Sequence, residues 1–156
     1  MEKLQESGEL PQIEKGTEDV PIELEYSLTD NYGQIKFEGK GSSFDFNSLP
    51  LSANHFDGYI KTPYGDFAYQ GPIIPLKEIL KNIKEYCSLS AELVSLKVPL
   101  EEAENKHRVS VSRWTNHGDN TGYSVTFQKE KELLDRVWFL KRRLSEYDTK
   151  ISSFRL

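Results

Sequence analysis

The sequence predicts an α+β domain whose mainly antiparallel sheet is built from three hairpins, with two amphipathic helices packed on one face. Three patterns favour this class: strict alternation of apolar and polar residues around turns, an apolar stripe with helical spacing after Pro75, and a helical period from Glu130 to the end. The resulting order of strand pairs, helix, further strands and helix is typical of α+β folds.

Two hairpins are predicted in the first half of the chain. Residues 22–28 and 35–38 alternate on either side of a turn that contains Gly33, and glycine tolerates the positive φ that such turns need. Residues 58–62 and 67–69 repeat this arrangement around a Pro-Tyr-Gly-Asp turn. Alternation of this kind favours a sheet with one covered face.

A third hairpin is predicted from residues 108–114 and 123–127, because turn-forming residues join them. Residues 93–100 are ambiguous, since their apolar residues alternate like a strand but could also extend the preceding helix. We favour a strand at the edge or end of the sheet, where its proline is tolerated. Residues 39–57 are expected to form a loop that holds one short strand at 44–46.

Two helices are predicted from apolar residues spaced three and four apart. Proline suits the first turn of the earlier helix, whose stripe comprises Leu76, Ile79, Leu80, Ile83 and Cys87. The later helix carries Leu133, Val137, Leu140, Leu144, Tyr147 and Ile151. Because Cys87 lies on an apolar stripe, we expect a buried and inert thiol.

The charge pattern divides the chain unevenly. Residues 1–20 are acidic and have no sustained period, so we expect a disordered tail before a single domain at 21–156. The formal net charge is −5, but residues 1–106 hold 10 basic against 19 acidic residues, and residues 107–156 hold 10 against 6. Such asymmetry indicates either a partner of opposite charge or an internal match.

The chain carries features of a cytoplasmic protein. Its N-terminus shows no basic and apolar signal pattern, and no run of residues is apolar enough to span a bilayer. A single cysteine excludes an intramolecular disulfide, which favours a reducing compartment. We therefore expect a cytoplasmic protein that does not enter a membrane.

Motifs for catalysis or cofactor binding are not found in the sequence. Residues 33–42 resemble a phosphate-binding loop, but the glycine spacing is one residue too long and the magnesium-binding Ser or Thr is replaced by Gly41. His55, His107 and His117 are far apart and do not pair at a metal-ligand spacing. We therefore expect no catalytic residues, no metal and no cofactor, and an enzyme with an unrecognised site ranks third among the functions considered.

The last helix offers the first choice of functional surface. Three of its apolar residues lie off the buried stripe and widen its apolar surface beyond what one sheet contact covers, and Arg142 lies near them. We predict that this chain is a small non-catalytic binding or regulatory module that contacts another protein or a second copy of itself. The residues are Leu134, Trp138, Phe139 and Arg142.

The alternative is binding of single-stranded nucleic acid by the basic last third of the chain. Aromatic side chains can stack on bases while arginines neutralise phosphates. A pI near 5.3 is low for such a domain. The candidate residues are Arg108, Arg113, Trp114, Tyr123, Arg136 and Arg143.

Overall fold

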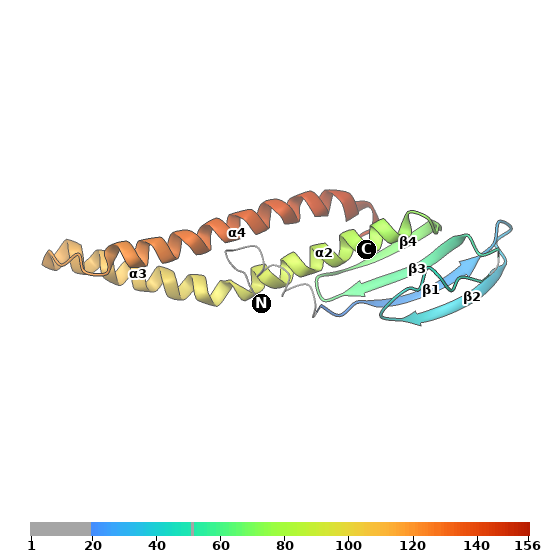
Figure 1. Cartoon of the computed structure of the whole chain (residues 1–156), viewed down its shortest axis with the longest axis horizontal. Helices are drawn as coiled ribbons and strands as arrows, with labels where there is room; N and C mark the ends of the chain where they lie inside the picture. Colours follow the sequence, from blue (N-terminus) through green and yellow to red (C-terminus); the bar gives the residue numbers. More distant parts are fainter. Residues whose placement is uncertain (1–19, 51) are drawn as a thin grey trace.

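A computed structural model of the chain describes residues 20–50 and 52–156 (Figure 1). It confirms the predicted α+β class. A four-stranded antiparallel sheet comes first and long helices follow: β1 Glu23–Thr29, β2 Ile35–Gly41, β3 His55–Thr62, β4 Gly65–Pro72, α2 Leu76–Ser95, α3 Lys97–His117, α4 Tyr123–Ile151, and the short 3-10 helix η1 Ser152–Phe154. The predicted acidic tail lies outside the described residues, apart from Val20 at its end.

The sheet has the strand order β2-β1-β3-β4, and every neighbouring pair is antiparallel. Both hairpins predicted in the first half of the chain are confirmed. Their turns place Gly33 at φ +81° and Gly65 at φ +140°, values that side chains disfavour. The Asp30 carboxylate tightens the first turn by accepting hydrogen bonds from the backbone N–H groups of Tyr32 and Gln34.

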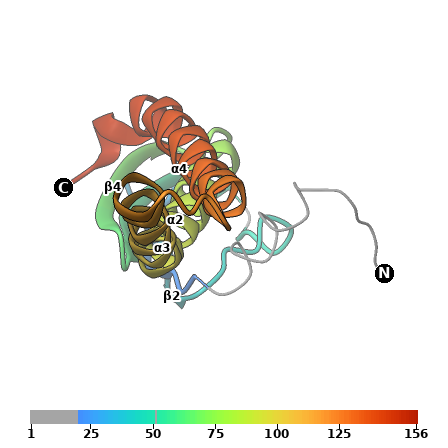
Figure 2. The ribbon, with the colours of Figure 1, turned by 90° about the vertical axis from the view of Figure 1, so that its left-hand side faces the viewer.

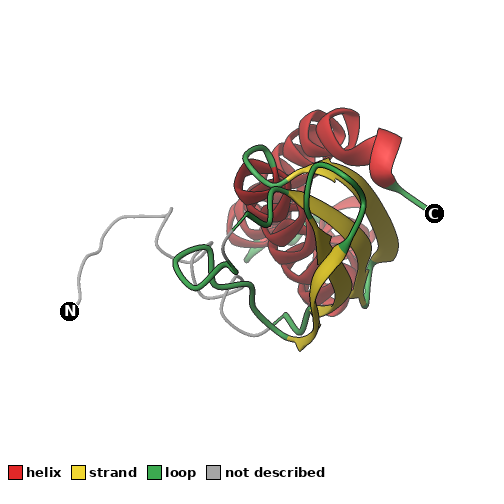
Figure 3. Ribbon diagram, turned by 90° about the vertical axis from the view of Figure 1, so that its right-hand side faces the viewer, coloured by secondary structure: helices red, strands yellow, loops and turns green. Residues whose placement is uncertain are grey.

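The main core lies between one face of the sheet and α2. Alternate residues of β1 and β3 point inward, so Leu24, Leu28, Phe56 and Ile60 are buried while their neighbours are not. The apolar stripe predicted for α2 packs against them, and Ile151 from the end of α4 joins the same cluster. Figure 3 shows the helices gathered on one side of the curved sheet.

The third hairpin predicted from residues 108–114 and 123–127 is wrong. Both segments are helical: the first belongs to α3 and the second begins α4. The two helices are joined by a short turn in which Gly118 and Gly122 adopt φ +69° and +81°. Glycine in the left-handed conformation is a common way to end a helix, so the turn residues were recognised correctly but the elements that they join were not.

Two shorter predictions also need correction. Residues 93–100 do not form a strand: α2 continues to Ser95, and α3 begins at Lys97. Pro99 falls in the first turn of α3, where its missing N–H has no helical partner to lose. Residues 44–46 do not form a strand but belong to the loop after β2, which turns at residues 46–47, although Phe44 and Phe46 still pack against the main core.

The molecule is elongated, with the sheet at one end and a pair of helices at the other (Figure 1). Figure 2, viewed from the helical end, shows α3 and α4 side by side in front of the sheet. Helices α2 and α3 follow one another away from the sheet, and α4 returns alongside both of them. The chain then closes on the sheet edge, where Arg155 forms a β-bridge with Phe67, and the N–H of Leu156 donates to the carbonyl of Asp66.

Candidate functional site

The part of the molecule that extends beyond the sheet is a helical arm, which we define as α3 together with residues 123–139 of α4. The two helices run antiparallel and are joined across their contact by a 2.9 Å hydrogen bond between His107 Nδ1 and Thr126 Oγ1. The arm therefore presents two long helical surfaces that the sheet does not cover.

The arm has a thin core. Ala103 and Ser110 are the buried residues of α3, whereas α2 buries seven residues. In α4 the first fully buried side chain is Leu140, which lies just after the arm and packs in a second cluster with Leu89 and Tyr147. Because Ala103 and Ser110 are small, α3 and α4 can approach each other closely, but these side chains remove little apolar area from water. The arm thus depends on its base for most of its stability.

An ion pair fixes the base of the arm to α2. The Arg136 guanidinium donates two hydrogen bonds to the Glu92 carboxylate, from Nε at 2.6 Å and from Nη2 at 2.8 Å. Both side chains are largely covered, with 23% and 12% of their surface exposed. Such bidentate geometry constrains the direction of both side chains, so the pair sets the rotation of α4 about its axis.

A hydrogen-bonded tyrosine makes a second connection nearer the sheet, about three turns further along α4. The Tyr147 hydroxyl donates to Glu85 on α2, and Arg143 donates to the same hydroxyl oxygen. The hydrogen bond to Glu85 raises the pKa of Tyr147; burial and the charge of Glu85 raise it further, while Arg143 opposes the change. The neutral hydroxyl is therefore the stable form, and it joins the two helices.

The rotation of α4 leaves a row of apolar side chains facing outward. We call Phe127, Leu134 and Trp138 the outer stripe: their spacing of seven and four residues places them on one side of the helix. Trp138 is 73% exposed and Phe127 is 46% exposed, whereas Leu134 is only partly exposed. The Phe127 ring also lies 5.7 Å from the ring of His107 on α3. Arg142 is exposed and lies one further turn along the same side. The stripe is therefore apolar, with a basic residue at one end.

Phe139 points in a different direction from the outer stripe. It follows Trp138 directly, and consecutive helical residues are about 100° apart. The Arg136 guanidinium lies 5.0 Å from the centre of its ring, which leaves the ring 40% exposed. Of the four residues predicted to bind a partner, Leu134, Trp138 and Arg142 thus share a surface that Phe139 does not.

Four aromatic rings form a cluster near the tip of the arm. The Tyr123 ring lies 4.7 Å from that of Trp114, 5.0 Å from that of His107 and 6.2 Å from that of Phe127, measured between centroids. Trp114 and Tyr123 were predicted to lie on neighbouring strands of one hairpin; their rings lie side by side, but on helices. The sequence analysis missed His107 and Phe127; the helical spacings 107–114 and 123–127 could have revealed both.

The arginines proposed for phosphate binding are placed beside acidic groups. Arg136 pairs with Glu92, Arg143 lies 3.0 Å from Glu146, and Arg113 lies 3.9 Å from Asp119. Arg108 lines a shallow hollow together with the carboxylates of Glu101, Glu104 and Glu130. The structure therefore does not bring these side chains together as one basic surface.

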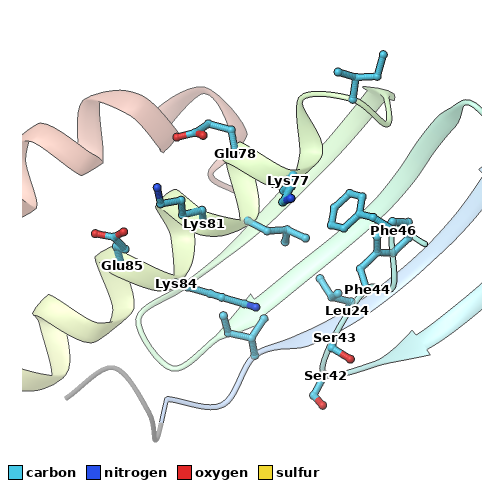
Figure 4. A pocket seen from close by; sticks show the side chains of 13 residues that line it. Leu24, Ser42, Ser43, Phe44, Phe46, Lys77, Glu78, Lys81, Lys84 and Glu85 are labelled. Carbon is cyan, nitrogen blue, oxygen red and sulfur yellow. The ribbon is translucent and has the colours of Figure 1, made fainter. Parts of the chain in front are cut away.

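A groove of about 710 Å³ lies between α2 and the loop after β2 (Figure 4). Three lysines of α2 follow a helical spacing along it, and apolar side chains from β1 and the loop lie opposite them. The sequence analysis did not predict this groove, because it depends on how the loop folds over the sheet. Its main lining residues are Ile22, Leu24, Phe44, Phe46, Leu80, Lys77, Lys81 and Lys84.

Cys87 is buried in the main core, as predicted from its place on the α2 stripe. Burial raises the pKa of its thiol, whereas a hydrogen bond with Thr62 and the charge of Arg155 lower that pKa by less. The thiolate is therefore disfavoured. In residues 20–50 and 52–156, no three His, Cys, Asp or Glu side chains are grouped closely enough to hold a metal ion.

Comparisons with known proteins give no match: the chain resembles no family model, no curated protein and no solved structure closely enough to be assigned to it. Within the part of the chain that the structure describes, no helix is both long and apolar enough to cross a bilayer. Among the large apolar side chains of α4, Trp138 of the outer stripe is the most exposed, at 73%.

Proposed function

We propose that this chain is a non-catalytic protein-binding module whose outer stripe on α4 contacts the partner. The observation that carries the proposal is the exposure of Trp138, 73% of whose surface faces water although α4 is held firmly at its base. Tryptophan is enriched among the residues that contribute most to protein interfaces. An aromatic anchor on a rigid helix loses little conformational freedom on binding.

The surroundings of Trp138 fit a protein interface better than a solvated surface. Phe127 and Leu134 continue the apolar row, while Lys131, Asp135 and Arg142 provide charged groups beside it. A small apolar centre with a polar rim is the common arrangement of protein interfaces. The surface is also long and narrow, which suits a helix or an extended segment as the contacting element.

We predict that Trp138→Ala reduces capture of the partner by at least about tenfold, because truncating an aromatic anchor of an interface typically costs about 2 kcal/mol or more. The full chain is immobilised, incubated with nuclease-treated lysate of the source cells, and the retained proteins are quantified by mass spectrometry. Thermal unfolding of the variant is measured in parallel and should change little, since the side chain makes few internal contacts.

Val109→Ala is the matched control. Val109 is 57% exposed on α3, so this change also removes apolar surface from the arm but leaves the outer stripe intact. It should retain the same proteins as the natural chain. Equal retention by Trp138→Ala, or equal loss in both variants, would contradict a partner surface on α4. Loss of all retained proteins on nuclease treatment would favour the nucleic-acid alternative.

A further inference from the structure

The charged residues beside the outer stripe are arranged symmetrically about its centre. Phe127 and Trp138 lie at its two ends, with a midpoint at position 132.5, and the oppositely charged Lys131 and Asp135 have their midpoint at 133. The two midpoints differ by half a residue, which is about 0.75 Å along a helix. The stripe therefore matches itself when one copy is turned end to end.

We propose that the partner of the outer stripe is a second copy of this chain, bound antiparallel about a two-fold axis near position 133 of α4. This inference rests on the proposed function, because it names the partner of the same surface. Phe127 of each copy faces Trp138 of the other, and Leu134 of each copy lies close to the axis. A self-matching patch of this kind is what a two-fold dimer requires.

Charge complementarity favours this orientation. In the antiparallel pair, Lys131 of each copy faces Asp135 of the other, which gives two attractive contacts. In a parallel two-fold pair, the flank that carries these charges would lie on opposite sides of the contact in the two copies, so Lys131 and Asp135 would not meet across it and both attractive contacts would be absent. At the end of the stripe, Arg142 comes level with the uncharged Ser124 of the other copy, so no like charges meet there.

In the single chain, Lys131 and Asp135 can give up their mutual ion pair at little cost. Lys131 Nζ lies 2.9 Å from Asp135 Oδ2 of its own helix, but the two side chains are 55% and 65% exposed. An ion pair between such exposed groups contributes little to stability. Each charge can therefore leave its neighbour in the same helix for the equivalent group of the second copy without a large loss.

The test uses two charge variants of the full chain, Lys131→Asp and Asp135→Lys, studied alone and mixed in equal amounts. Alone, each variant sets like charges against each other twice across the axis, and we expect its self-association to weaken by at least about tenfold. In the mixture, every cross-chain contact is again between opposite charges, so sedimentation equilibrium should show a heterodimer with affinity close to that of the natural chain. Within each helix, the like charges at positions 131 and 135 repel each other equally before and after mixing, so only the contacts between chains change.

Recovery of association on mixing supports the antiparallel second copy. Dimers that persist in both variants alone, or variants that stay monomeric when mixed, would overturn it. A natural chain that is monomeric at every concentration would also overturn the antiparallel dimer. In that case, loss of captured protein in Trp138→Ala would still support the proposed function, with a different protein as the partner. If Trp138→Ala changes neither capture nor association, the proposed function itself fails.

Discussion

Tyr26 shows how strongly the sheet depends on single residues. Its side chain points inward from β1 and contacts Phe44 and Phe56, while Gly39 of β2 and Gly58 of β3 are its neighbours in register. A methyl group at Gly58 would lie 2.5 Å from both the carbonyl oxygen of Glu25 and Cβ of Tyr26. The backbone atoms at this contact cannot move far without disturbing the ladder of hydrogen bonds.

We therefore predict that Gly58→Ala lowers the free energy of unfolding by about 1–3 kcal/mol, the usual range for overpacking in a core. Gly41→Ala is the control, because a methyl group there meets no atom within 4 Å and lies in the same sheet. Chemical denaturation of both variants, followed by circular dichroism, gives the comparison. A loss at Gly41 as large as that at Gly58 would show that the close contact with β1 is not the cause.

At the scale of elements, the attachment of α4 to α2 decides which side of α4 faces water. The Glu92–Arg136 pair is the strongest polar contact between them, since it is bidentate and mostly covered. We predict that Glu92→Gln destabilises the chain by about 1–3 kcal/mol, because it leaves a half-buried guanidinium without its counter-charge. A double-mutant cycle with Arg136→Gln measures the coupling. Additive effects would contradict a direct pair.

The elements that the sequence predicts correctly are those with long, regular patterns. The first two hairpins, the α2 stripe and the α4 seam all follow their apolar periods, and Leu140, Tyr147 and Ile151 of that seam are indeed buried. Each of these elements contacts a substantial core, so their apolar residues had to fall on one side.

The errors arise where the apolar pattern is weak. In α3, the side facing α4 carries Ala103 and Ser110, which a hydrophobic pattern does not register, while Val109 and Val111 alternate like a strand although both are exposed. Short apolar runs of this kind do not distinguish strand from helix. The helical sequence Leu93, Leu96, Leu100, Ala103 was present but was outweighed by the alternation of the neighbouring valines.

The candidate site was predictable in part for the same reason. Leu134 and Trp138 do not lie on the buried apolar stripe of α4. A helical wheel alone therefore shows that packing on the core does not explain why these two positions are apolar. Phe127 was predicted to lie in a strand, so the sequence did not indicate that it belongs to the outer stripe. The symmetric placement of Lys131 and Asp135 becomes visible once α4 is known to begin at Tyr123.

At the scale of the whole molecule, the charge asymmetry of the sequence is matched partly within the fold. The basic last segment returns along the acidic part of α2, where Arg136 meets Glu92, and Arg143 donates to the Tyr147 hydroxyl that is bound to Glu85. Among the described residues, Glu92–Arg136 is the one ion pair that joins the two segments, and the other ion pairs of the last segment lie within it. The fold therefore matches a small part of the asymmetry internally.

The two ends of the molecule differ in how well they are packed. The sheet end contains a continuous core of thirteen buried residues, including Leu76, Ile83 and Cys87 from α2. The arm has few buried side chains and leaves several large apolar ones in water, among them Trp138 and Val125. Exposed apolar surface of this kind commonly marks an interaction site. The sheet end is therefore the better packed part of the molecule, and the arm carries the surface that we propose for a partner.

Collisional quenching of Trp138 fluorescence tests the central claim, that the outer stripe is open in the single chain and covered on binding. In a Trp114→Phe variant, Trp138 is the one remaining tryptophan. We expect iodide to quench it readily in dilute solution, as its 73% exposure implies, and several-fold less as association proceeds with rising concentration. Shielding at the lowest concentration would contradict the open stripe, and unchanged quenching in the associated form would contradict docking through α4.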